Sequence, residues 1–125
     1  MPNNKFSRYI TSKKHFSKQN NYVKSAAFMP NRNQKLSVFC IDELVEEEIW
    51  EIGYNNISIP TSKEIYARAN IEAEDILTTI LEIDNNNTPL RHADIIGWPS
   101  EKEDQKGIAL ELSRKSALVI KPPLI

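Results

Sequence analysis

The order of short apolar segments along the chain constrains its fold more than any other feature. Four segments of five to eight residues are rich in strand-forming side chains, and two longer ones carry apolar residues at helical spacing. In chain order they are a strand at 36–41, a helix at 43–52, strands at 63–70 and 77–83, a helix at 100–116 and a strand at 117–121. This order predicts an α+β fold, in which two main helices cover one face of a small mixed or antiparallel sheet.

Residues that start and stop helices support both helical segments. Asp42 is a suitable N-cap and Gly53 a suitable terminator, so we expect a helix between them. Ile57–Pro60 follows and predicts an extended edge segment, because proline cannot donate a hydrogen bond to a strand ladder. Ser100 and Glu103 have the spacing of a capping box at the start of the last helix.

The chain has a single cysteine, Cys40, and no apolar run of the roughly 18 residues that a membrane span needs. Alternation within 36–41 places Cys40 on the same face as Leu36 and Val38, where a thiol acts as a small apolar group rather than as a nucleophile. One cysteine cannot form an internal disulfide and does not indicate an oxidising compartment. Frequent Asn, Ile and Lys are typical of an AT-rich microbial genome. We therefore expect a microbial, cytoplasmic protein that does not enter a membrane.

Charge is distributed unevenly along the chain. The first 40 residues contain eight Lys and Arg and no Asp or Glu, whereas the remaining residues carry eight cations and all 17 anions. A cationic segment attracts polyanions and accelerates their association. We therefore expect residues 1–34 to form a basic, aromatic-containing arm, and residues 35–125 to form a single compact α+β domain. The alternative is that the arm folds back on the acidic body of its own chain or of a second copy.

Aromatic residues recur within the expected arm, among them Phe6, Tyr9, Phe16 and Tyr22. Rings interleaved with cations can stack on bases while the charges contact phosphates, although rings in a domain of this size more often belong to the core. In the first use, nucleic acid or another polyanion contacts seven cations. These are Arg8, Lys13, Lys14, Lys18, Lys24 and Arg32 of the arm, and Arg68 of the strand at 63–70.

The segment 88–100 concentrates uncommon side chains and is predicted to be a loop that leads into the last helix. It contains Arg91, a forked donor for phosphate or carboxylate, beside His92, which exchanges a proton near neutral pH. With His15 from the arm, these two residues form the candidate catalytic set for a metal-independent reaction on RNA or a nucleotide. The structural alternative pairs Arg91 with Asp94 and hydrogen-bonds His92 to the backbone.

No cofactor or metal motif is present in the sequence. Its three glycines lie too far apart for a phosphate-binding loop. The soft or borderline ligands Cys40, His15 and His92 are not at zinc-ligand spacing. We therefore expect neither a cofactor nor a metal.

Three functions fit these features. The first is a polyanion-binding domain, for nucleic acid or a nucleotide, that acts within a larger system. The second is an assembly or protein-interaction subunit, with a protein partner or in a homo-oligomer, whose basic arm docks on acidic surfaces. The third is a metal-independent enzyme of the toxin or defence type that acts on RNA or a nucleotide. We rank polyanion binding first because charge segregation is the clearest functional signal in the chain; whether the chain is an enzyme stays open at this point.

Overall fold

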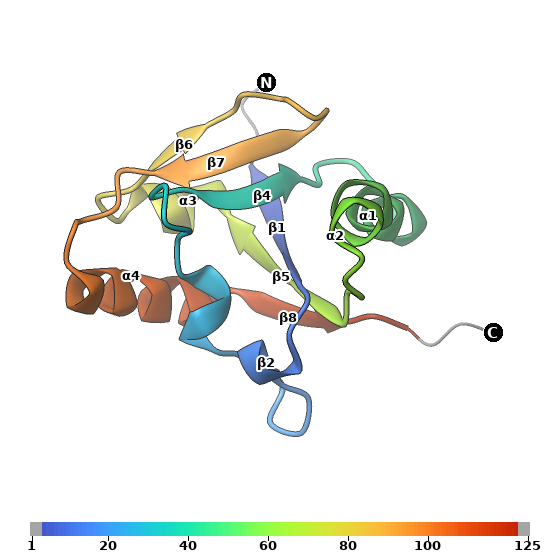
Figure 1. The fold of residues 1–125 in the computed structure, drawn as a ribbon, viewed down its shortest axis with the longest axis horizontal. Helices are drawn as coiled ribbons and strands as arrows, with labels where there is room; N and C mark the ends of the chain where they lie inside the picture. The colour runs from blue at the N-terminus through green and yellow to red at the C-terminus, as the bar shows by residue number, and fades with distance from the viewer. Residues whose placement is uncertain (1–3, 123–125) are drawn as a thin grey trace.

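A computed structural model describes residues 4–122, and a six-stranded antiparallel sheet forms the centre of the fold (Figure 1). The strand order in the sheet is β6-β7-β4-β1-β5-β8. The strands are β1 (Lys5–Ile10), β4 (Leu36–Cys40), β5 (Ala67–Glu72), β6 (Glu82–Asp84), β7 (His92–Ile96) and β8 (Ala117–Ile120). The α+β prediction is therefore confirmed, and the sheet is antiparallel rather than mixed.

β1 lies in the middle of this sheet, paired with β4 on one side and with β5 on the other. Phe6 lies opposite Cys40 of β4 and Ile71 of β5. Phe6 and Ile10 are buried, because alternate residues of a strand face the same side of the sheet. The separate basic arm expected for residues 1–34 is not confirmed, since this part of the chain supplies a central strand of the domain.

The chain between β1 and β4 folds over one face of the sheet. It contains the short helices η1 (Lys13–His15) and η2 (Ser25–Phe28), with a hairpin of β2 (Phe16–Ser17) and β3 (Tyr22–Val23) between them. η2 packs against α4 (Lys102–Lys115), and Phe28 at its end is fully buried. Burial of this ring is part of the free energy that holds the segment on the domain.

Helices lie on both faces of the sheet, as Figure 1 shows for α4 and α1 (Glu46–Gly53). On one face α4 buries Ala109 and Leu112 in the larger hydrophobic core. On the other face α1 packs Ile49 against Tyr9 and Phe39. The expected pair of main helices on one face is not confirmed, because α4, with 14 residues, lies on one face and α1, with eight, lies on the other. The central strands carry apolar residues on both sides, so each side needs a cover.

α1 does not begin where Asp42 predicted. The Asp42 carboxylate instead accepts hydrogen bonds from the backbone amides of Asn4 and Lys5, each at 2.9 Å. The helix begins after Val45, whose amide donates to the Glu48 carboxylate at 3.1 Å. Asp42 thus fixes the start of β1 rather than the start of a helix.

Gly53 does not end this helix, which continues through the π-helical turn η3 (Tyr54–Ser58) into α2 (Ile59–Thr61). The prediction of an extended segment at 57–60 is therefore wrong. Ile52 and Ile57 both pack against the smaller core, so apolar contacts keep the chain helical past the glycine.

The segment 88–100 is not a loop throughout, because its middle forms β7. Ala93 and Ile95 of this strand are fully buried, while His92 and Asp94 face the other side. The prediction of a strand at 77–83 is also wrong, since the chain forms α3 (Ala73–Leu77) and a turn before the short β6.

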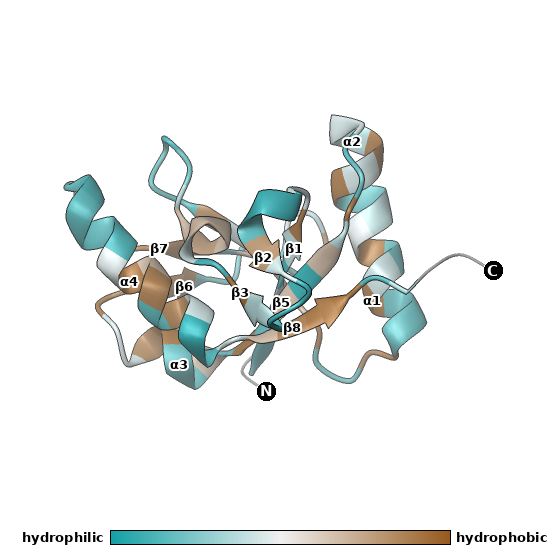
Figure 2. Cartoon of the chain, turned by 90° about the horizontal axis from the view of Figure 1, so that it is seen from below, coloured by the Kyte–Doolittle hydropathy of each residue, from teal (hydrophilic) through white to brown (hydrophobic). Residues whose placement is uncertain are grey.

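The last predicted helix and strand are confirmed, as α4 and β8. The capping box is not, because α4 begins after Glu101 and has no side-chain hydrogen bond at its N-cap. β8 closes one edge of the sheet with four apolar residues, mostly brown in Figure 2, and Leu118 and Ile120 pack against the larger core. Apolar packing therefore holds this edge strand in place.

Cys40 lies in the larger core with 3% of its surface exposed, as its place in the strand predicted. Burial raises the pKa of its thiol, which disfavours the nucleophilic thiolate. In the part of the chain that the structure describes, none of the helices has the length and apolar character that crossing a membrane requires.

Candidate polyanion-binding surface

Two of the seven predicted contact cations, Arg8 and Arg68, point into the protein. Arg8 lies on the α4-facing side of β1, where Nε and Nη1 donate to the carbonyls of Ala27 and Ser37, each at 3.0 Å. Desolvation by burial lowers the pKa of Arg8 to about 10. Arg68 is 1% exposed and donates from Nη2 to the Glu46 carboxylate at 2.7 Å. Neither side chain is placed to meet a polymer on the molecular surface.

Arg91 also binds within the chain. Its Nη1 donates to the carbonyls of Cys40, at 3.2 Å, and Asp42, at 3.1 Å. Cys40 is the last residue of β4 and Asp42 lies two residues beyond it, so this arginine ties the start of β7 to the end of the neighbouring strand. The predicted pairing of Arg91 with Asp94 is replaced by these two backbone contacts.

His92 is held by hydrogen bonds at both ring nitrogens. Nδ1 lies 2.8 Å from Asn86 Oδ1, and Nε2 lies 2.7 Å from the Ser37 hydroxyl. The Asn86 Nδ2 donates to the Asp94 carboxylate at 3.0 Å, which turns the amide oxygen toward the ring. In the neutral ring Nδ1 therefore carries the proton, and Nε2 accepts from the Ser37 hydroxyl. These contacts fix the orientation of the imidazole between β4, β7 and the residues that follow β6.

His15 lies on the other side of the sheet from His92. Desolvation by burial, followed by the charge of nearby Arg8, lowers the pKa of His15. His92 instead lies edge-on to Phe39, in the core beneath α1, with ring centroids 5.3 Å apart. The structure therefore does not bring the candidate catalytic residues His15, Arg91 and His92 into one site.

Four of the predicted contact cations are exposed on the segment between β1 and η2. They are Lys13 and Lys14 in η1, Lys18 in the turn of the hairpin and Lys24 between β3 and η2. The Lys24 amide donates to the His15 carbonyl at 2.9 Å, which brings Lys24 next to η1. None of the four forms an ion pair with a carboxylate of residues 4–122. Their charges are thus not neutralised within the described part of the chain.

A groove of about 700 Å³ separates this segment from the C-terminal half of α4. Among the described residues that line this groove, Lys24 and Arg114 are the charged ones, and no Asp or Glu is present. Tyr22, which is 47% exposed, also lines the groove, together with Asn21 and Ser25. Two cations, a ring and neutral hydrogen-bonding groups therefore face the same space.

Arg32 lies apart from this groove. It is exposed in the turn that precedes β4, and the neighbouring Gln34 accepts a hydrogen bond from Gln105 at 2.7 Å. Gln105 is near the start of α4, whereas Ser113 and Ser116 of the groove are near its end. Eight residues of helix separate the two places by about 12 Å.

Sequence reasoning missed Arg114 as part of this surface. Basic residues in the last turn of a helix are expected to offset the helix dipole, so Arg114 carries no separate signal of binding. Tyr22 was named only among the rings of the arm. Its place directly after the polar turn 18–21 is a sequence signal for an exposed hairpin position.

No family model, characterised protein or solved structure matches this chain, so the surface is interpreted from its own geometry. Among residues 4–122, no group of three or more His, Cys, Asp or Glu side chains is placed to hold a metal ion.

Proposed function

We propose that the chain binds a polyanion, most simply single-stranded nucleic acid, along the groove between the β2–β3 hairpin and α4. The observation that carries this proposal is the charge of the groove, whose charged lining residues, Lys24 and Arg114, are both cations. Lysines without carboxylate partners extend the same surface across η1 and the hairpin turn. A phosphate backbone supplies the charge that this surface lacks.

The exposed ring of Tyr22 supports a single strand over a duplex. A base that is not paired can stack on a tyrosine ring, and such stacking contributes about 1–3 kcal/mol per base. Tyr22 is two residues before Lys24 and lines the same groove, so one nucleotide can place its base on the ring and its phosphate at the ammonium group. Binding of this kind tolerates many sequences, because every base presents a π-face.

The experiment measures the affinity for a fluorescent single-stranded RNA by anisotropy, over a series of salt concentrations. If the five cations Lys13, Lys14, Lys18, Lys24 and Arg114 each contact a phosphate, the log–log salt slope should be about −3.5. Removing two of them, in Lys24→Gln/Arg114→Gln, should lower the magnitude of the slope by about 1.4. Tyr22→Ala should weaken binding and leave the slope unchanged, because the ring carries no charge.

The matched control is Lys102→Gln/Lys106→Gln, which removes the same charge from the exposed N-terminal half of α4. It should change the slope little, because these lysines do not line the groove. The proposal fails if binding is absent at low salt, if affinity is flat with salt, or if the control weakens binding as much as the groove variant does.

A further inference from the structure

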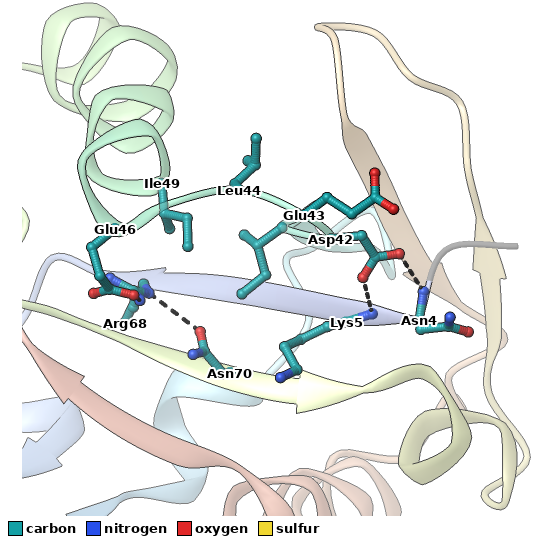
Figure 3. Close-up of a pocket in the computed structure, with 10 residues that line it drawn as sticks. Asn4, Lys5, Asp42, Glu43, Leu44, Glu46, Ile49, Arg68 and Asn70 are labelled. Atoms are coloured by element: carbon teal, nitrogen blue, oxygen red, sulfur yellow. Dashed lines mark hydrogen bonds and ion pairs between the residues drawn. The ribbon is translucent and has the colours of Figure 1, made fainter. Parts of the chain in front are cut away.

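A second pocket lies on the opposite face of the sheet, between β1, β5 and the start of α1, with a volume of about 470 Å³ (Figure 3). Arg68 and Glu46 stand at one end of this pocket, and Asp42 and Lys5 stand at the other. The apolar side chains of Ile41, Leu44 and Ile49 also line it. The volume and the mixed lining are those of a site for a small molecule.

Unsatisfied hydrogen-bond donors gather on this face of the sheet. Among the described residues, three buried side-chain atoms have no hydrogen-bond partner, namely Ser7 Oγ, Trp50 Nε1 and Arg68 Nη1. Ser7 lies opposite Asn70, which lines the pocket, and the Arg68 guanidinium lies over the Trp50 ring at 4.4 Å. Buried polar groups are almost always paired, and the Arg and Trp atoms can only donate. This layer of the protein therefore lacks an acceptor.

Arg68 is prepared to bind an acceptor at one edge of its guanidinium. Its Nε is 3.3 Å from the Asn70 amide oxygen and its plane packs on Trp50, so the group is held in place. Nη2 already binds the Glu46 carboxylate at 2.7 Å, whereas Nη1 binds nothing. Glu46 makes one bond to the fork with a side chain that is 67% exposed, so it can move into solvent. A ligand carboxylate that replaces Glu46 and bridges Nη1 and Nη2 accepts two hydrogen bonds instead of one.

We infer that this pocket binds a small monocarboxylate, whose carboxylate displaces Glu46 and bridges Nη1 and Nη2 of Arg68. The apolar body of the ligand packs on Ile41, Leu44 and Ile49. A monoanion fits better than a phosphate dianion, because the lining carries three carboxylates, those of Asp42, Glu43 and Glu46, against the two cations Lys5 and Arg68. This site is separate from the groove at α4, and neither depends on the other.

The test titrates the full chain with 4-methylpentanoate, a monocarboxylate with a branched apolar body, by calorimetry and by tryptophan fluorescence. Trp50 stacks on the guanidinium and should report binding, whereas Trp98 is buried in the other core and supplies a constant background. Glu46→Gln should tighten binding at least about fivefold, because it removes the competing carboxylate. Glu47→Gln is the matched control: it removes the same charge from the same exposed helical turn, and it should change the affinity little.

Arg68→Lys keeps the charge but removes the fork, and it should weaken binding about tenfold or more. The glutamate variants are on the surface, so they test the inference even if Arg68→Lys does not fold. The inference is overturned if neither the wild type nor Glu46→Gln shows saturable binding of 4-methylpentanoate. It is also overturned if Glu46→Gln and Glu47→Gln change the affinity equally, or if inorganic phosphate binds more tightly than the carboxylate.

Discussion

Gly53 is where α1 approaches the sheet, and replacing it with alanine should destabilise the protein by about 1–2 kcal/mol. A methyl group at this position would lie 2.7 Å from Cε1 of Tyr9 and 2.8 Å from Cδ1 of Ile65. The Tyr9 ring cannot easily withdraw, because its hydroxyl donates to the Ile49 carbonyl and the ring packs at a tilt against Phe39. Overpacking of this kind costs about 1–3 kcal/mol.

The higher helix propensity of alanine favours the substitution, so the outcome depends on whether this gain or the cost of the clash is larger. Gly53 has helical dihedral angles, with φ of −62°, and alanine is better than glycine in a helix by about 1 kcal/mol. The clash costs about 2–3 kcal/mol, the upper part of that range, because both contacts are under 3.0 Å and the nearest atoms belong to a fixed ring and a buried side chain. The net loss is therefore about 1–2 kcal/mol. Gly107 provides the control, because nothing lies within 4 Å of its added methyl group in α4. Gly107→Ala should therefore stabilise the protein by about 1 kcal/mol.

Urea unfolding of the two variants, followed by circular dichroism, measures both effects on one scale. The reasoning is refuted if Gly53→Ala is as stable as the wild type, or if the two alanine variants shift the midpoint in the same direction. In the first case Tyr9 would be free to move, and the tight contact between α1 and the sheet would not constrain the pocket at Arg68.

Two further predictions concern the other face of the sheet. Trp98→Ala should destabilise the protein by about 3–5 kcal/mol in the same urea assay. The reason is that the ring is only 8% exposed and its Nε1 donates to the Ile95 carbonyl at 2.9 Å. A loss of stability below about 1 kcal/mol would contradict the burial of the ring. For His15, burial and the charge of Arg8 hold the pKa below its ordinary value of 6.5, so the unfolded chain binds this proton more readily. Stability should therefore fall as the pH drops below about 6.5 until it passes the lowered pKa. His15→Gln should flatten this part of the stability profile, and an unchanged profile would count against the lowered pKa.

Much of the fold could be predicted because the strands show their periodicity in the sequence. Alternation placed Leu36, Val38 and Cys40 on one face, as observed. The predictions failed where tertiary contacts outweighed local signals. Asp42 has the residue type of an N-cap, yet it binds two amides of β1, a segment 37 and 38 residues away in sequence. No local pattern encodes such a contact.

The candidate site was predictable only in part, for a related reason. The count of cations before residue 41 drew attention to Lys24 and its neighbours, which are exposed, but a count does not separate surface residues from interior ones. Arg8 is flanked by Ser7 and Tyr9 within a strand and turns inward, because alternate residues of a central strand face a covered side. Arg114 was missed for the opposite reason: it lies far from the basic segment in sequence and joins it only in the folded chain.

The two interior arginines show how a ligand site can be distinguished from a structural one. Arg8 and Arg68 lie on adjacent strands, β1 and β5, and face opposite sides of the sheet. The donors of Arg8 are met by main-chain carbonyls, which the fold fixes and no ligand can displace. Arg68 is met by an exposed glutamate and keeps one donor unpaired. Because an unpaired buried donor costs free energy, a protein that retains one at the end of a pocket gains stability whenever an acceptor enters. On this reasoning a carboxylate ligand should raise the unfolding temperature through Arg68 alone, and removing the charge of Arg8 should leave that rise intact.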